Sequence, residues 1–355
     1  MSFYKLLLKP ILFQLDPERA HDLMVALGEW LGHAAFGRAL VRFLYGYRGS
    51  VISKTLDGIT YTTPFLLCAG FDYNGRLTRI LSSIGMSGEE VGSVTARASA
   101  GNPTPRLTRL IRSQSILVNK GLRNDGVDAI IKRLKSQPRE KGYVVGISIA
   151  RTNDAQAASI EEGIADYKYS LERLVAENVG DFYTINISCP NAFGGETFTT
   201  PTLLKSLLSE LKTVKHSKPM YVKMPINLPW NVFEELLTII DTLGFSGVVI
   251  GNLNKEYNSL THRDEAPEKY AGGLSGKPCE QLSNGLIRKT RERFGTRFTI
   301  FGCGGVLSPE SALEKFNAGA DMIQMVTGLI FEGPSLVKRS CRAYAHMSNT
   351  AGGLG

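Results

Sequence analysis

A cysteine flanked by two asparagines is the residue group best suited to catalysis in this sequence. The run NISCPN, Asn186 to Asn191, follows a short apolar segment. Carboxamides both donate and accept hydrogen bonds, which suits the polar edge of an imide-containing ring. The ordinary pKa of a cysteine is about 8.5, so Cys189 could act as a thiolate base toward a carbon acid. The alternative is a small buried apolar residue, a common role for cysteine. The two asparagines and the proline favour the base.

Glycines after two later apolar runs predict a phosphate site. Gly304 and Gly305 follow one run, and Thr327 begins a helix after the next. Glycines allow close approach to the main chain, and backbone N–H groups at a helix start bind anions. The loop 272–276, GGLSG, adds further donors around Ser275 and Gly276.

Two groups of basic residues also need anionic partners. Lys223 lies inside the apolar segment YVKM, where a lysine is costly without a partner. A reduced flavin, which gathers negative charge near N1 and O2, would supply one; a salt bridge in the protein core is the alternative. Residues 91–124 contain no Asp or Glu but carry several Arg and Lys residues, including Arg109, Lys120 and Arg123, so this stretch should attract anions.

Eight short apolar runs alternate with helix-length segments and must position these residues. Such runs, rich in Val and Ile, are typical of buried parallel strands. Eight of them over about 300 residues predict an α/β fold, a (β/α)8 barrel, with its chemistry at the carboxyl ends of the strands. The expected strands are Leu66–Gly70, Glu90–Thr95, Tyr143–Ala150, Phe182–Ser188, Met220–Met224, Gly247–Gly251, Phe298–Gly302 and Met322–Val326.

The first 48 residues predict helices that precede the barrel. Asp16 and Pro17 form a typical helix start, and apolar residues then recur at helical spacing. The apolar face and nearby arginines suit an interfacial helix on anionic lipid, while packing on the main domain explains them equally well. We therefore expect a helical segment at 1–48, a barrel at 49–345 and a flexible tail at 346–355. No apolar run reaches the roughly 18 residues of a membrane span.

The composition limits the possible partners. The 355 residues are 43% hydrophobic with a net charge of +8, which suits a globular protein with acidic ligands. The five cysteines are scattered without a CxxC pair, so a structural zinc site is not expected and a reducing compartment is favoured. No helix-turn-helix, RNP or zinc-finger pattern indicates nucleic-acid binding.

Motifs along nearly the whole chain resemble those of the dihydroorotate dehydrogenase family, in its membrane-associated, quinone-reducing class. They include FQLDPERAH at 13–21, GSVT at 92–95, GNP at 101–103, the NISCPN run and GLIFEGP at 328–334. The resemblance implies an FMN-bearing barrel with a helical pair that leads quinone from a membrane surface to the flavin. It implies oxidation of dihydroorotate to orotate, in which the base takes a proton from C5 and C6 delivers hydride to flavin N5. The expected location is peripheral, on the cytoplasmic side of a membrane.

The resemblance also assigns residues to roles. Cys189 corresponds to the base, and His21 and Arg109 to the quinone path. The pyrimidine is expected to be held by Asn119, Asn186, Asn191 and Asn252. The expected FMN-binding positions are Ala69, Gly70, Thr95, Ser148, Asn186, Lys223, Ser275, Gly276, Gly304, Gly305, Val326 and Thr327.

Several positions depart from the family pattern. The quinone-reducing class carries Ser where this chain has Cys189. The family also has a Lys that contacts the flavin and the substrate carboxylate, and this chain has Tyr73 at that position. Ser148 replaces an Asn, Leu253 a Thr and Val326 a Tyr. With Tyr73 in place of the Lys, Arg123 is the best substitute cation for the carboxylate and Lys120 the other. The alternatives are a paralogous flavoenzyme for another dihydropyrimidine or an enone-like substrate, or an FMN-binding protein without turnover.

Overall fold

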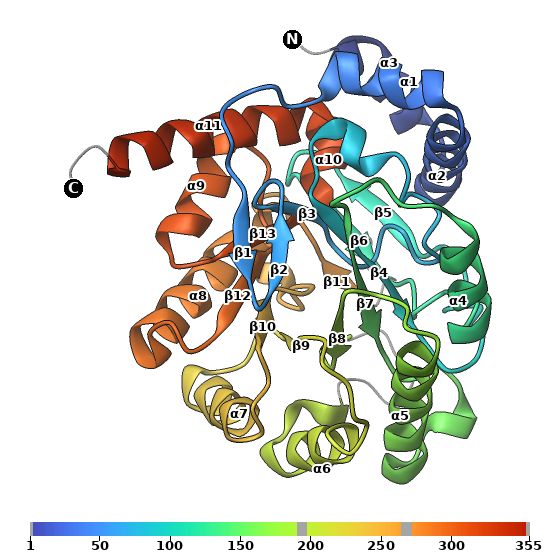
Figure 1. Ribbon diagram of the computed structural model, residues 1–355, viewed down its shortest axis with the longest axis vertical. Helices are drawn as coiled ribbons and strands as arrows, with labels where there is room; N and C mark the ends of the chain where they lie inside the picture. The colour runs from blue at the N-terminus through green and yellow to red at the C-terminus, as the bar shows by residue number, and fades with distance from the viewer. Residues whose placement is uncertain (1–2, 190–196, 264–271, 353–355) are drawn as a thin grey trace.

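Eight parallel strands close into a barrel, as the alternation of apolar runs predicts (Figure 1). The computed structural model describes residues 3–189, 197–263 and 272–352. Every expected strand overlaps an observed one, and nearly all strand residues are buried because helices cover the barrel from outside. In spatial order the strands are β10 (Gly247–Ile250), β12 (Thr299–Cys303), β13 (Met322–Met325), β3 (Phe65–Leu67), β4 (Gly88–Val94), β7 (Val144–Ile149), β8 (Phe182–Asn186) and β9 (Met220–Met224).

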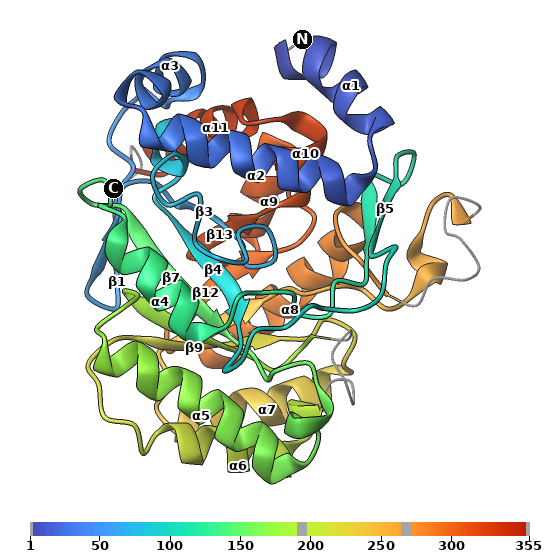
Figure 2. The same cartoon turned by 90° about the vertical axis from the view of Figure 1, so that its right-hand side faces the viewer.

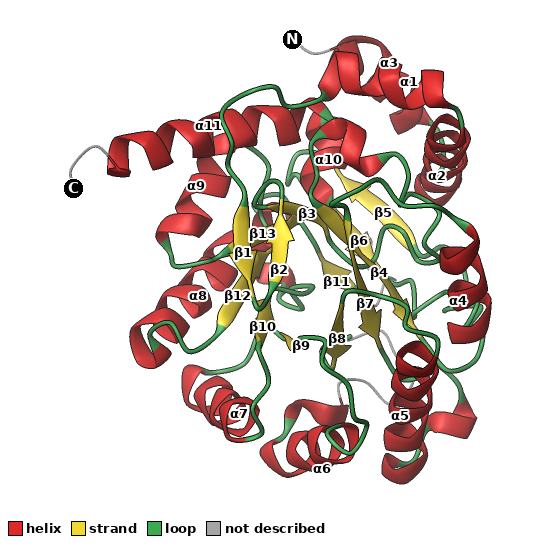
Figure 3. Cartoon of the chain, in the orientation of Figure 1, coloured by secondary structure: helices red, strands yellow, loops and turns green. Residues whose placement is uncertain are grey.

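Helices surround this barrel, as Figure 3 shows in red around the yellow strands. They are α4 (Val127–Ser136), α5 (Ile160–Ala176), α6 (Pro201–Leu211), α7 (Trp230–Thr242), α8 (Glu280–Phe294), α9 (Pro309–Asn317), α10 (Thr327–Glu332) and α11 (Ser335–Gly352), with single turns at η2 (Leu81–Ile84), η3 (Ala155–Ala157), η4 (Thr197–Thr199), η5 (Tyr257–Ser259) and η7 (Lys277–Cys279). Helix α11 continues past residue 345, where the sequence predicts the barrel domain to end.

A short hairpin covers the amino-terminal end of the barrel. Strands β1 (Lys54–Leu56) and β2 (Ile59–Tyr61) pair antiparallel and lie in front of the barrel in Figure 1. The Tyr61 ring packs into the interior on Phe301, which in turn stacks on Phe182. This aromatic cluster fills the amino-terminal end of the barrel interior, and the carboxyl ends of the strands lie at the other end.

The amino-terminal segment forms the predicted helices beside those carboxyl ends. They are η1 (Tyr4–Leu8), α1 (Lys9–Gln14), α2 (Pro17–His33) and α3 (Ala35–Tyr45). The Asp16 carboxylate caps α2 by accepting from the backbone of Glu18 and Arg19 at 3.0 Å each. Gly28 lets α2 approach the barrel loops closely, since a Cβ there would lie 2.7 Å from Leu77 Cδ2. Figure 2 shows α2 crossing above the strands, with α1 projecting away from them.

A three-stranded antiparallel sheet at the barrel mouth was not predicted. Strands β5 (Leu107–Leu110) and β6 (Ser115–Val118) form a hairpin, and β11 (Gly273–Leu274) pairs with β6. The donor-rich loop 272–276 is therefore partly a strand. Because β11 lies more than 150 residues after β6, local periodicity could not reveal their pairing.

Candidate active site

A cavity of about 470 Å³ runs between the amino-terminal helices and the carboxyl ends of the barrel strands. The helices contribute apolar side chains such as Leu12, Met24 and Leu31, and the barrel contributes the polar ones. Most of the predicted site residues line it. They are His21, Ala69, Gly70, Tyr73, Arg109, Arg123, Asn186, Cys189, Lys223, Asn252, Ser275, Gly276, Gly304, Gly305, Val326 and Thr327.

The asparagine–cysteine run forms part of the cavity wall. Asn186 ends β8, where its Nδ2 donates to Ser93 Oγ at 2.8 Å and its carbonyl accepts from the Tyr167 hydroxyl at 2.7 Å. Asn252 Nδ2 donates to Ser188 Oγ at 2.6 Å. These bonds fix the residues that precede the half-buried Cys189, which borders the same cavity. A thiol fixed beside two carboxamides can take a proton from a ring that they orient. Asn191 lies outside the described residues.

Lys223 is buried at the bottom of the cavity, where its ammonium group bonds a thiol. Its Nζ donates to Cys68 Sγ at 3.3 Å, and Cys68 Sγ lies 3.3 Å from Cys303 Sγ. Burial lowers the pKa of Lys223, but Cys68 and Cys303 outweigh it and raise the pKa above its ordinary value. The ammonium therefore stays charged and can stabilise negative charge in the cavity. Sequence reasoning identified the lysine but missed both thiols.

The glycine loops have the conformations that close approach to the backbone requires. Gly276, Gly304 and Gly305 have φ of +76°, +94° and +80°. A Cβ at Gly70 would meet nothing within 4 Å, since that residue borders the open cavity at φ +101°. Thr327 Oγ1 donates to Ser275 Oγ at 2.9 Å, which joins two of the predicted phosphate-binding loops.

Three predicted residues do not line the cavity. Thr95 is buried and accepts from Asn124 Nδ2 at 2.7 Å, and Ser148 hydrogen-bonds Ser93 at 2.8 Å. Asn119 Oδ1 accepts from Asn102 Nδ2 at 2.8 Å. The structure gives all three residues protein partners away from the cavity lining, and their predicted contacts with ligand stay predictions.

A group of cations converges on Glu18 of α2, beside Tyr73. Glu18 Oε1 lies 2.8 Å from Lys120 Nζ, 2.9 Å from Arg106 and 3.1 Å from Arg123. Burial raises the pKa of Glu18, but the bonds from Lys120 and Arg106 outweigh it, so the net shift is downward and the carboxylate stays ionised. Lys120 Nζ lies 5.2 Å from the centre of the Tyr73 ring, and its side chain is 7% exposed against 39% for Arg123. Sequence reasoning had not identified Glu18 as their partner.

The predicted quinone-path residues lie where helices and barrel meet. His21 Nε2 donates to the Phe71 carbonyl at 2.8 Å, and its Nδ1 lies 3.2 Å from Asp22 Oδ1. Burial lowers the pKa of His21 below its ordinary value, with these two contacts opposing. Arg109 donates to the Leu15 carbonyl at 2.8 Å and lies over the Phe13 ring. Both side chains thus provide polar groups along an otherwise apolar passage.

Among the described residues, no group of three or more His, Cys, Asp or Glu side chains is placed to hold a metal ion. No helix in the described ranges is long and apolar enough to cross a membrane.

Comparison with known proteins matches most of the chain. Residues 51–347 match the family model described as dihydroorotate dehydrogenase. A protein of Nostoc punctiforme named dihydroorotate dehydrogenase (quinone) is 32% identical over 353 residues, covering 96% of this chain and 92% of that protein. A protein of the same name from Natronomonas pharaonis is 34% identical, covering 95% and 93%. The crystal structure of DHODH from Eimeria tenella in complex with ferulenol has a TM-score of 0.82, covers 96% of each chain and is 23% identical, which supports the fold alone.

Proposed function

The chain belongs to the dihydroorotate dehydrogenase family, and on that premise we propose that it oxidises dihydroorotate to orotate on a bound FMN and passes the electrons to a quinone. The observation that carries this proposal is the continuity of the cavity. Cys189, Lys223 and the asparagines line its barrel end, and apolar side chains of the amino-terminal helices line the other. A polar substrate and an apolar acceptor can thus reach one cofactor from different sides.

The residues present fit a flavin mononucleotide. Gln324 is fully buried against the cavity, and within the described ranges neither polar atom of its amide has a hydrogen-bond partner. Lys223 offers an ammonium for the pyrimidine part of the flavin, and Gly70 leaves open space beside the backbone. The loops of Ser275, Gly276, Gly304, Gly305 and Thr327 suit a single phosphate.

The flavin, when bound, supplies a two-electron acceptor for the hydride of C6. Cys189 removes the C5 proton as its thiolate. Asn186 and Asn252 orient the pyrimidine ring, since their carboxamides match its alternating donors and acceptors. Lys223 would help to hold the flavin, and its ammonium group would stabilise negative charge that the flavin carries.

A second candidate function is oxidation of another dihydropyrimidine. Tyr73 favours it, because a phenol cannot replace an ammonium opposite a carboxylate. Burial raises the pKa of Tyr73, so it acts as a neutral hydrogen-bond donor. Growth of a pyrimidine auxotroph on the cloned gene tests the first function; failure to complement with a protein that retains flavin favours the second. A flavin protein that bleaches with neither class of substrate would support an FMN-binding protein without turnover.

The purified protein is expected to be yellow and to release FMN rather than FAD. The glycine loops provide for one phosphate, and the sequence has no dinucleotide fingerprint. Heat denaturation followed by chromatography of the supernatant identifies the flavin. A protein that stays colourless after incubation with FMN would contradict the cofactor assignment.

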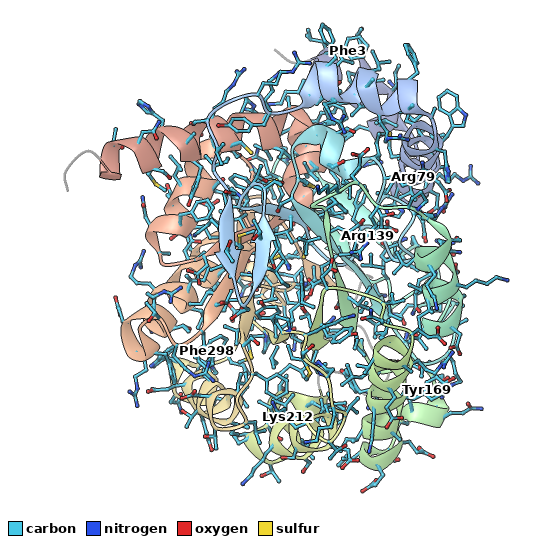
Figure 4. All side chains as sticks on the ribbon, in the orientation of Figure 1. Phe3, Arg79, Arg139, Tyr169, Lys212 and Phe298 are labelled. Atoms are coloured by element: carbon cyan, nitrogen blue, oxygen red, sulfur yellow. The ribbon has the colours of Figure 1, made fainter. Side chains whose placement is uncertain are left out.

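We also propose that the amino-terminal helices bind a membrane peripherally. Trp30, Phe36 and Phe43 are 67%, 79% and 67% exposed, and Phe3 points outward at the top of Figure 4. Aromatic side chains of this kind insert at the lipid–water interface, and the nearby basic residues favour anionic lipid.

The triple variant Trp30→Glu, Phe36→Glu, Phe43→Glu is expected to lose most binding to anionic liposomes and most quinone reduction. None of the three side chains lines the cavity, so flavin reduction by dihydroorotate should be unchanged. The matched control is Ile160→Glu, an exposed residue of α5, and Figure 2 shows α5 at the opposite end of the molecule from α2 and α3. Liposome flotation with rapid-mixing spectroscopy measures both effects. Equal liposome binding by triple variant and wild type would show that the helices only pack on the barrel.

A further inference from the structure

Two cysteines that have no role in the reaction face each other at the cavity floor. Cys68 directly follows β3, and Cys303 ends β12, with only β13 between these strands. Their sulfur atoms are 3.3 Å apart, within reach of a thiol hydrogen bond, and Lys223 Nζ lies 3.3 Å from Cys68 Sγ. Both side chains line the cavity, so they are open to whatever occupies it.

The surroundings favour a reactive thiol on one side of this pair. The pKa of Cys303 is lowered to about 7, chiefly by the hydrogen bond from Cys68. Burial raises this pKa, while the nearby charges of Lys223 and Lys315 lower it. The bond to Cys303 and burial raise the pKa of Cys68, and Glu90 also faces both thiols from β4 and raises each pKa. A thiolate beside a protonated thiol is the arrangement from which disulfide exchange proceeds.

The other described cysteines are less suited to this chemistry. Cys279 is buried, and its thiol donates to the Leu274 carbonyl at 3.1 Å. Cys341 is fully buried in α11, and burial raises its pKa to about 12. Cys189 belongs to the reaction centre proposed above. The pair is therefore chemically distinct from the remaining cysteines.

We propose that Cys68 and Cys303 are a redox-active pair that closes to a disulfide within the cavity and exchanges two electrons with the flavin bound there. Two S–H bonds break and one S–S bond forms, while two electrons and two protons pass to the oxidant. That oxidant is the oxidised flavin or, in its place, an added small disulfide. The exchange with flavin rests on the proposed function, whereas closure of the disulfide does not.

The first test is a cross-link in the purified, flavin-containing protein. The protein is treated with oxidised glutathione, remaining thiols are blocked with N-ethylmaleimide, and the digest is read by mass spectrometry. A peptide joining Cys68 to Cys303 is expected, removed by dithiothreitol and absent from Cys68→Ala. The control Cys341→Ala should keep it. Both cysteines recovered as separate maleimide or glutathione adducts would overturn the proposal.

The second test counts electrons without measuring turnover. After oxidation, anaerobic titration with dithionite should consume about twice as many electrons per flavin in the wild type as in Cys68→Ala, because the disulfide is a second two-electron couple. Equal uptake in the two proteins would overturn the exchange with flavin. A protein without a flavin spectrum contradicts the proposed cofactor, whereas a flavin-containing protein without the cross-link overturns the thiol pair alone.

Discussion

Replacing Cys189 with alanine is expected to slow the reduction of bound flavin by dihydroorotate by about a hundred- to ten-thousand-fold, the usual contribution of a positioned base. The flavin should remain bound, because the glycine loops and Lys223 do not depend on the thiol. Cys189→Ser should also be slow near neutral pH, since a hydroxyl is a poorer base than a thiol. Stopped-flow bleaching of the flavin absorbance from pH 6 to 10 measures both variants.

The matched control is Cys279→Ala, which removes a cavity thiol whose hydrogen bonds, among the residues that the structure describes, go to the main-chain carbonyls of Asn252 and Leu274. It should bleach at nearly the wild-type rate. Bleaching of Cys189→Ala at the wild-type rate would exclude the thiol as base and leave the deprotonation to another group.

The fold was predictable because its signals are local. Runs such as 182–186 and 220–224 carry buried apolar residues at strand length, and eight of them determine a barrel. Catalytic groups of such barrels lie at the carboxyl ends of the strands, so Cys189 and Lys223 could be expected near each other, and both line one cavity. The cap of α2 was predictable for the same reason, since Asp16 and Pro17 are adjacent in sequence.

The features that could not be predicted from the sequence depend on contacts between distant segments. Cys68 and Cys303 are 235 residues apart, and nothing near either residue indicates the other. The sheet of β5, β6 and β11 likewise joins two separate regions. Glu18 belongs to a helix start by its local pattern, yet its partners lie 88 to 105 residues away. Sequence reasoning therefore chose Arg123 as the substitute cation without knowing how deeply each cation is buried.

Substitution of Lys120 by methionine is expected to weaken orotate binding by about a hundredfold, or ~3 kcal/mol. Lys120, Arg106 and Arg123 share Glu18, and Arg123 also lies 3.6 Å from Asp22, so three cations face two carboxylates. One positive charge is left over, and a substrate carboxylate entering beside Tyr73 would balance it. Lys120 is the most buried of the three cations, and an ion pair excluded from water is screened least.

Arg123→Met is the matched control, because it removes the same charge from the same cluster at a more exposed position. Arg123→Met should weaken orotate binding severalfold at most, as is usual when an exposed ion pair is lost. Uracil lacks the carboxylate, so neither variant should change its affinity. Quenching or perturbation of the flavin spectrum reports binding of both ligands. Loss of orotate affinity in Arg123→Met alone would show that Arg123, rather than Lys120, pairs with the substrate carboxylate. Unchanged affinity in both variants, together with faster dihydroorotate turnover in Tyr73→Lys, would mean that the wild-type site is built for a substrate without that carboxylate.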